Sequence, residues 1–346
     1  QYAKENKSSD VLFGYGFLAS AFGPDGPTSL MLDEVVSDKP ILILDEGFHG
    51  GWANSKAMQK LGINKSTSDP MPGFSYYKRD AQGNATGYLL EGTATDAIEK
   101  LGVITAKSVA KGTGDVIKIM NSYGITSVFD AGASDVDALQ LDVLKLLEKE
   151  EKLTVRMVAS HMIGQANQAH GAIDIVKHKS NISKHEMFHI NTLKIMNDGT
   201  IEGKTAGMFE DYQGEPGNKG KTVFSQNQMN RLLSEASAEN IDVHIHALGE
   251  RTISETLNAI EVAREKYPNA NNRFAICHIQ VMQDRDIERF SRLGVMAQST
   301  PLWASYDVFG KAFVSDDQFN RYFRFNSLKK AGVRQSYGSD FPATGA

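Results

Sequence analysis

Residues 240–249 of the chain, Asn-Ile-Asp-Val-His-Ile-His-Ala-Leu-Gly, contain the pattern that decides the fold. Apolar and polar residues alternate through Ile241–Ala247, which predicts a β-strand with two different faces. A helical pattern follows directly over residues 253–260, where apolar side chains recur at helical spacing. A strand followed by an amphipathic helix is the unit from which parallel sheets are built.

The same unit recurs along most of the chain. Glycine separates the helical pattern from the next strand at Gly294 and Gly332, as expected of a helix C-cap before a short loop. Sustained alternation predicts an α/β fold with a parallel sheet, either open or closed into a barrel. No G-x-G-x-x-G and no phosphate-binding P-loop motif is present, so nucleotide binding has no support. The other strand-like runs are Ile125–Phe129, Val155–Ala159, Ile190–Ile195, Phe274–Ile279, Val295–Ala297 and Val333–Tyr337.

The first hundred residues have a different character. Residues 14–27 are rich in Gly, Pro and Ser, Ile41–Asp45 predicts a short strand, and Asn54–Leu61 predicts a helix. Residues 69–93 are expected to be loop-rich, with scattered aromatic side chains. We therefore predict a division into residues 1–105, an entry region with an insertion near the substrate, and residues 106–346, which carry the barrel strands and the site.

Composition narrows the classes of function. The chain has 346 residues, 37 basic and 42 acidic, with a formal net charge of −5 and 41% hydrophobic residues. This acidic balance argues against nucleic acid and membrane surfaces as partners. The single cysteine, Cys277, rules out an internal disulfide and a multi-cysteine zinc site. Residues 1–5 lack the apolar core of a signal peptide, so cytoplasm and bacterial periplasm both remain open.

Polar residues stand at the ends of several predicted strands. His244 and His246 share one face of their strand, His278 ends the next strand, Asp340 ends the last, and Lys194 lies within an apolar strand. Each has an ordinary structural explanation: a satisfied core histidine, a turn-forming aspartate or a snorkelling lysine. Together, imidazoles and a carboxylate suit a divalent ion of the zinc type. A lysine can join them only after CO₂ converts its amine into an anionic carbamate.

Six motifs, in order along nearly the whole chain, resemble the amidohydrolase superfamily, and most closely its family 3, which includes N-substituted formamide deformylases. The resemblance implies a (β/α)₈ TIM-type barrel with one or two Zn²⁺ ions at its C-terminal face. It places Lys194 after strand 4, His246 after strand 5, His278 after strand 6 and Asp340 after strand 8. The motifs are His49–Ser55 with Leu61–Ile63; Arg79–Glu91; Lys194–Gly199 with Thr205-Ala206; His246–Glu250; Arg273 with His278–Gln280; and Gly338–Pro342.

The resemblance also assigns roles. Asp340 is expected to be a metal ligand and the general base, and carbamylated Lys194 is expected to bridge two metals. His49, Trp52 and Arg79 are expected to bind substrate, since the insertion would lie over the barrel mouth.

The sequence departs from the family pattern in four respects. The H-x-H of strand 1 is missing, because the first 48 residues contain no histidine, and little of the family's small β-sandwich domain is present. We expect the sequence to lack both ends of a longer protein; the alternative is a catalytic relic. Thr300-Pro301 stands where the family has Gln-Pro, and Glu250 stands where it has Asp.

These observations predict a metal-dependent hydrolase that cleaves the C–N bond of a small amide or formamide-like molecule. An esterase, lactonase or phosphoesterase on the same scaffold is the alternative within enzymes, because the ligands activate water whatever the leaving group. A catalytically dead barrel that binds a ligand is the alternative outside them. The expected partners are a small-molecule substrate and a second copy of the chain in a homodimer, not nucleic acid or a membrane.

Overall fold

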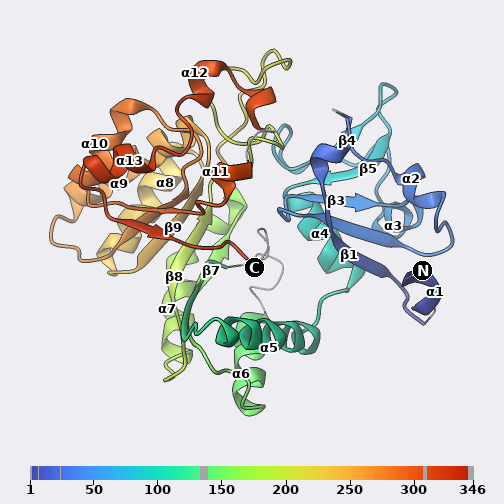
Figure 1. Ribbon diagram of the computed structural model, residues 1–346, viewed down its shortest axis with the longest axis horizontal. Coiled ribbons are helices and arrows are strands. Elements are labelled where there is room, and N and C mark those ends of the chain that lie inside the picture. The colour runs from blue at the N-terminus through green and yellow to red at the C-terminus, as the bar shows by residue number, and fades with distance from the viewer. Residues whose placement is uncertain (1, 7, 24, 133–138, 307–309, 342–346) are drawn as a thin grey trace.

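The chain contains two separate β-sheets, which lie on opposite sides of the molecule in Figure 1. The computed structural model describes residues 2–6, 8–23, 25–132, 139–306 and 310–341. Pro342, the last residue of the predicted Gly338–Pro342 motif, lies outside these residues. Among the described residues, no helix is both long enough and apolar enough to cross a membrane.

The N-terminal sheet has five strands in the order β1-β2-β3-β5-β4. β1 pairs parallel with β2, and the remaining pairs are antiparallel. Its core joins Leu42, Leu44 and Leu89 to Ala94 and Ala97 of the following helix. The elements are α1 (Tyr2–Glu5), β1 (Leu12–Phe17), η1 (Ala19–Ala21), α2 (Ser29–Asp33), β2 (Ile41–Asp45), β3 (Gly50–Ala53), α3 (Ser55–Leu61), β4 (Tyr76–Arg79), β5 (Ala85–Leu90) and α4 (Gly92–Leu101).

The structure confirms the strand predicted at Ile41–Asp45 and the helix predicted near residues 54–61. The loop-rich stretch predicted at residues 69–93 also contains β4 and β5, an antiparallel hairpin that the sequence analysis did not identify. The turn between them is built by Asp80, whose carboxylate accepts hydrogen bonds from the backbone N–H groups of Gln82 and Asn84, at 3.0 and 2.8 Å. An Asp-Gly-Asn cluster that resembles loop in the sequence is therefore the turn of a hairpin.

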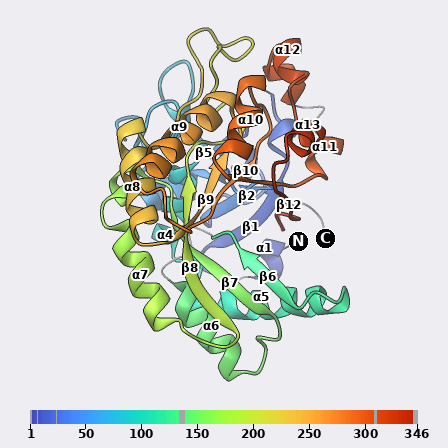
Figure 2. The ribbon, with the colours of Figure 1, turned by 90° about the vertical axis from the view of Figure 1, so that its left-hand side faces the viewer.

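The second sheet has seven parallel strands, β6 to β12, arranged side by side in chain order. All seven strands predicted from the sequence are present. Figure 2 shows helices α7 to α10 on the outer face of this sheet. The strands are β6 (Ser127–Asp130), β7 (Arg156–Ile163), β8 (Phe188–Met196), β9 (Asp242–Ala247), β10 (Phe274–His278), β11 (Met296–Ser299) and β12 (Gln335–Tyr337).

Helices separate these strands, as the alternating pattern predicted. Gly294 and Gly332 adopt φ of 66° and 74°, the left-handed conformation expected of helix C-caps. The helical segments are α5 (Ala106–Ser122), α6 (Gln140–Lys149), η3 (Ala166–Ala169), α7 (Ala172–Ile182), α8 (Gln226–Ala238), α9 (Glu250–Lys266), α10 (Asp284–Arg292), α11 (Trp303–Tyr306), η4 (Gly310–Phe313), α12 (Asp316–Phe319) and α13 (Phe325–Lys330).

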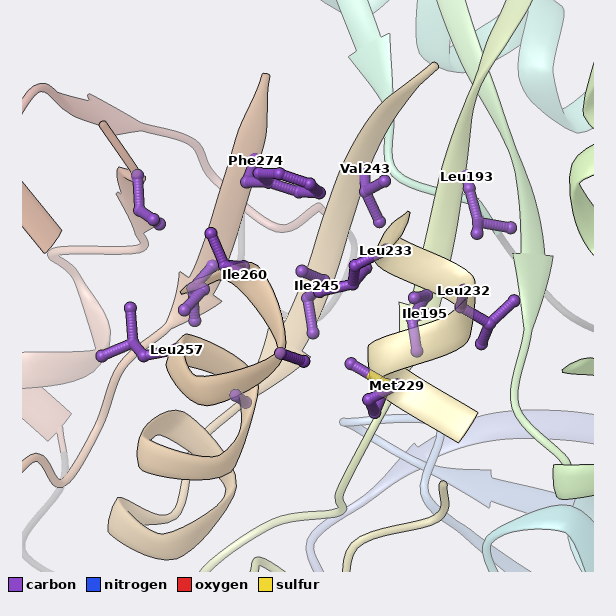
Figure 3. Close-up of a cluster of buried hydrophobic side chains, with 14 of the residues drawn as sticks. Leu193, Ile195, Met229, Leu232, Leu233, Val243, Ile245, Leu257, Ile260 and Phe274 are labelled. Atoms are coloured by element: carbon purple, nitrogen blue, oxygen red, sulfur yellow. The ribbon is translucent and has the colours of Figure 1, made fainter. Parts of the chain in front are cut away.

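The largest core lies between the outer face of this sheet and its helices. Figure 3 shows Leu193 and Ile195 of β8 and Val243 and Ile245 of β9 facing α8 and α9. All four side chains are buried. Because side chains alternate along a strand, this packing fixes the opposite direction for Lys194, His244 and His246.

The described part of the sheet is therefore a curved parallel α/β layer whose edge strands are β6 and β12. Closure into an eight-stranded barrel and the small β-sandwich remain predictions. The division at residue 105 also remains a prediction, and it falls between α4 and α5.

Candidate metal centre

Lys194, His244 and His246 face away from the outer core and are buried on the other side of the sheet. Lys194 and His244 are direct partners in the β8–β9 ladder, and Cys277 of β10 is the partner of His246. The Lys194 Nζ lies 3.1 Å from His244 Nδ1 and 3.1 Å from Cys277 Sγ. Among the described residues, the amine's hydrogen-bond partners are thus an imidazole and a thiol rather than a carboxylate.

His246 is held by a buried carboxylate that the sequence analysis missed. Its Nδ1 lies 3.1 Å from Asp198 Oδ1, and neither side chain is more than 3% exposed. Burial lowers the pKa of His246 well below its ordinary 6.5, which favours the neutral ring. With Nδ1–H directed at the carboxylate, Nε2 keeps its lone pair, which is how metal-binding histidines are commonly oriented.

Asp198 is itself fixed by the loops around it. Its carboxylate accepts backbone N–H groups from Leu248 at 3.1 Å, Gly249 at 2.9 Å and Gly207 at 3.2 Å. Burial raises the pKa of Asp198 to about 7, and the backbone donors oppose that rise. The carboxylate is therefore held in position by three backbone donors.

His278 lies beside His246, with ring centroids 4.6 Å apart. Its φ of 72° is in the left-handed region, which costs of order 1–3 kcal/mol and is most often retained at functional sites. Burial lowers the pKa of His278 well below 6.5, and its buried Nδ1 has no hydrogen-bond partner among the described residues. The ring stacks on Trp303, with centroids 5.0 Å apart and planes 11° apart. Trp303 is another neighbour that the sequence analysis did not identify.

His49 comes from the N-terminal sheet and lies near His246 and His278. Its Nδ1 lies 2.8 Å from Glu91 Oε2, and Thr205 Oγ1 donates to Glu91 Oε1 at 2.9 Å. Burial would lower the pKa of His49, but the charge of Glu91, its hydrogen bond to the ring and the charges of Asp45 and Asp340 together outweigh that effect and raise the pKa to about 9. Glu91 adopts φ of 54° and ψ of −127°, a strained backbone held by the surrounding contacts.

Asp340 follows β12 and has a φ of 53°. The residue is exposed, yet desolvation of its carboxylate raises its pKa, while the charges of Lys194 and His49 lower it. The exposure and the raised pKa together indicate a carboxylate that is open to solvent on one side and desolvated on the other. The structure thus brings His49, Lys194, His246, His278 and Asp340 into one electrostatic neighbourhood.

Trp52 and Arg79 make their contacts within the N-terminal sheet instead. The Trp52 indole donates to the Thr28 carbonyl at 2.7 Å and lies in an aromatic cluster with Phe17 and Phe22. The Arg79 guanidinium donates to the Gly83 carbonyl at 3.1 Å, with further bonds to the carbonyls of neighbouring loops.

Two further features concern where a ligand could bind. Among the described residues, no group of three His, Cys, Asp or Glu side chains is arranged to hold a metal ion. A cavity of about 350 Å³ lies near the amino ends of β8 and β9, lined in part by Lys177, Ser180 and His189. Because parallel α/β folds bind ligands at the carboxyl ends of their strands, we place the functional site at the histidines and not at this cavity.

The family pattern of the amidohydrolases matches residues 1–346. The chain belongs to the amidohydrolase family. This confirms the predicted resemblance. The N-substituted formamide deformylase of Arthrobacter pascens is 25% identical to the chain over 327 residues, which are 91% of this chain and 58% of that protein. Exoenzymes regulatory protein AepA of Pectobacterium carotovorum subsp. carotovorum is 28% identical over 345 residues, covering 96% of this chain and 72% of that protein.

Among solved structures, an uncharacterized metal-dependent hydrolase from Pyrococcus horikoshii OT3 superposes with a TM-score of 0.69 at 21% identity. The match covers 96% of this amidohydrolase-family chain and 63% of the archaeal one. The likeness supports the α/β fold. The chain therefore spans between 58% and 72% of the length of these three proteins.

Proposed function

We propose that this protein hydrolyses a C–N bond of a small amide or formamide-like molecule with a metal-activated water. The observation that carries the proposal is the buried His246–Asp198 pair beside His278. A neutral imidazole oriented by a carboxylate is how proteins prepare a histidine to bind a metal. Membership of the amidohydrolase family and the activity for which the formamide deformylase is named favour C–N bonds as the target.

The proposed ligands are Lys194, His246, His278 and Asp340. The donor set fits a divalent ion: His246 presents its Nε2, and His278 has a buried nitrogen without a partner. Imidazole and carboxylate together favour Zn²⁺, as one or two ions. With two ions, Lys194 would serve as a carbamate, an anion that can bridge them. When bound, the ion lowers the pKa of a coordinated water and polarises the substrate carbonyl.

Asp340 is the proposed general base. Its one open side lets the carboxylate reach a water or substrate, and desolvation raises its pKa toward the range in which a carboxylate accepts protons well. The carboxylate takes the proton of the attacking water and then returns it to the nitrogen of the leaving amine. His49 is the proposed contact for the substrate, supported by its position between Glu91 and His246. Trp52 and Arg79 remain predicted substrate contacts.

The experiment that tests the proposal is metal analysis by plasma mass spectrometry on protein expressed from the complete gene. We expect about one or two zinc equivalents per chain, lost in His278→Ala and kept in His189→Ala. The same samples are assayed on matched pairs of amides, formamides and esters that share an acyl group. Hydrolysis of the esters alone would favour the esterase alternative. Absence of both metal and hydrolysis after incubation with zinc would favour a ligand-binding barrel.

A further inference from the structure

His244 is the one histidine of the His244-Ile245-His246 pair to which the proposed function gives no role. It lies two residues before His246 on the same face of β9, so its ring is one layer deeper in the sheet. Only 6% of the residue is exposed. The amine of Lys194 lies 3.1 Å from its Nδ1.

The His244 ring is held on more than one side. Phe129 of β6 meets it edge to face, with centroids 5.2 Å apart and planes 63° apart. Gln298 of β11 makes a side-chain hydrogen bond to it. Since Nδ1 faces Lys194, the remaining ring nitrogen is the one available to Gln298. An imidazole that donates from Nε2 to Gln298 presents a lone pair at Nδ1 to the lysine.

A carbamate on Lys194 would carry an N–H group that this lone pair can accept. When the neutral Lys194 amine attacks CO₂, an N–C bond forms, one C=O electron pair moves onto oxygen, and one N–H proton is released to solvent. The nitrogen of the product keeps a single N–H. Of the two groups within 3.1 Å of Nζ, the imidazole of His244 is a strong acceptor and the thiol of Cys277 a weak one.

We infer that His244, anchored by Gln298, is a positioning residue that accepts the remaining N–H of carbamylated Lys194. That hydrogen bond fixes the conformation of the end of the lysine side chain. It thereby directs both carbamate oxygens away from His244, toward His246 and His278. The inference rests on the proposed function, because it assigns His244 a role only if Lys194 is a carbamate ligand.

The test follows the carbamate itself rather than turnover. Protein from the complete gene is equilibrated with ¹³C-bicarbonate and zinc, and the carbamate carbon is observed by NMR beside the metal content. His244→Phe keeps a ring of similar size but removes the acceptor, whereas His244→Asn keeps an oxygen near the position of Nδ1. His161→Phe is the matched control, because His161 is a buried histidine of β7 that contacts Lys179 instead.

We expect the ¹³C signal and the zinc affinity to fall about 10- to 100-fold in His244→Phe, to recover in part in His244→Asn, and to stay unchanged in His161→Phe. An unchanged signal in a folded His244→Phe protein overturns the inference. If that variant fails to fold, Gln298→Leu leaves His244 in place but removes its anchor, and an unchanged signal there overturns it equally. Wild-type protein that hydrolyses amides with zinc but shows no ¹³C signal overturns this inference alone. Wild-type protein with neither metal nor hydrolysis overturns the proposed function.

Discussion

The rings of His49 and His246 lie 5.7 Å apart, centroid to centroid, although the two residues belong to different sheets. His49 precedes β3 of the N-terminal sheet, whereas His246 belongs to β9 of the parallel sheet. Glu91 forms a hydrogen bond with the ring of His49. It also accepts a hydrogen bond from Thr205, which lies in the loop after β8. The site is therefore formed by both sheets, and the N-terminal one supplies a group that faces the proposed metal ligands.

Replacing Glu91 with Gln tests what this arrangement contributes to substrate binding. The neutral amide removes the largest of the charges that raise the pKa of His49, so less of the ring is cationic near neutral pH. We expect KM to rise about tenfold, equivalent to about 1.4 kcal/mol of binding, with a smaller change in kcat. Steady-state kinetics measure the two constants. Glu99→Gln, an exposed substitution on α4, is the control, and equal KM values in both variants would refute the role of Glu91.

Asp198→Asn tests the orientation of His246. The amide cannot accept from the imidazole and from three backbone N–H groups as an anion does, so we expect zinc affinity to fall about 10- to 100-fold. Competition with a zinc chelator measures the affinity. Asp286→Asn removes an equally buried carboxylate that contacts Ser254 and Arg289 on another part of the fold. Equal affinity losses in the two variants would mean that burial, and not contact with His246, explains the effect.

Asp340→Asn tests the general base. The residue is exposed, so we expect the thermal unfolding midpoint to stay close to that of the wild type. Loss of a positioned base lowers kcat by about 100-fold or more. Initial rates on the best amide substrate and a thermal melt check both expectations. Hydrolysis at the wild-type rate would remove Asp340 from the mechanism.

Asp45→Asn tests a prediction about stability and pH. Burial raises the pKa of Asp45 from 3.8 to about 6, although His49 lowers it. The folded protein therefore keeps the proton up to about pH 6, while the unfolded chain releases it near 3.8, and stability is lost as the pH rises through this range. Above it the penalty is at most about 3 kcal/mol.

Urea unfolding at about pH 4.5 and pH 8 measures this difference. We expect Asp45→Asn to raise the free energy of unfolding more at the higher pH, because only there does the wild type carry the buried charge. The Asn oxygen can still accept the backbone N–H of His49. The exposed Asp38→Asn should show the same change at both values. A gain in the Asp45 variant that is independent of pH would contradict the expectation.

Much of the fold could be predicted from the sequence because its signals are local. Buried parallel strands appear as short apolar runs between helical patterns, and the alternation of His244, Ile245 and His246 shows which side chains share a face. The β4–β5 hairpin was missed because its turn residues, Asp80 to Asn84, resemble loop, and the short strands beside them carry no clear alternation.

The partners of the predicted site residues were harder to find. Asp198 is separated by 48 residues from His246, and Glu91 by 114 residues from Thr205. No periodic pattern links positions so far apart. A signal was nevertheless present, because Glu91 and Asp198 both fall within motifs shared with the family. Their roles became visible only when the side chains could be seen in contact.

The contact between Glu91 and Thr205 also bears on how the protein folds during synthesis. Strands β6 to β12 lie in chain order, so the parallel sheet can grow one strand at a time as the polypeptide leaves the ribosome. The contact between Glu91 and Thr205 leaves no space for a side chain at Gly199, whose Cβ would come within 2.4 Å of the Glu91 carboxylate. The contact itself can form only after Thr205 has been synthesised, 114 residues after Glu91. The N-terminal sheet is therefore complete in sequence well before its contact with the parallel sheet becomes possible.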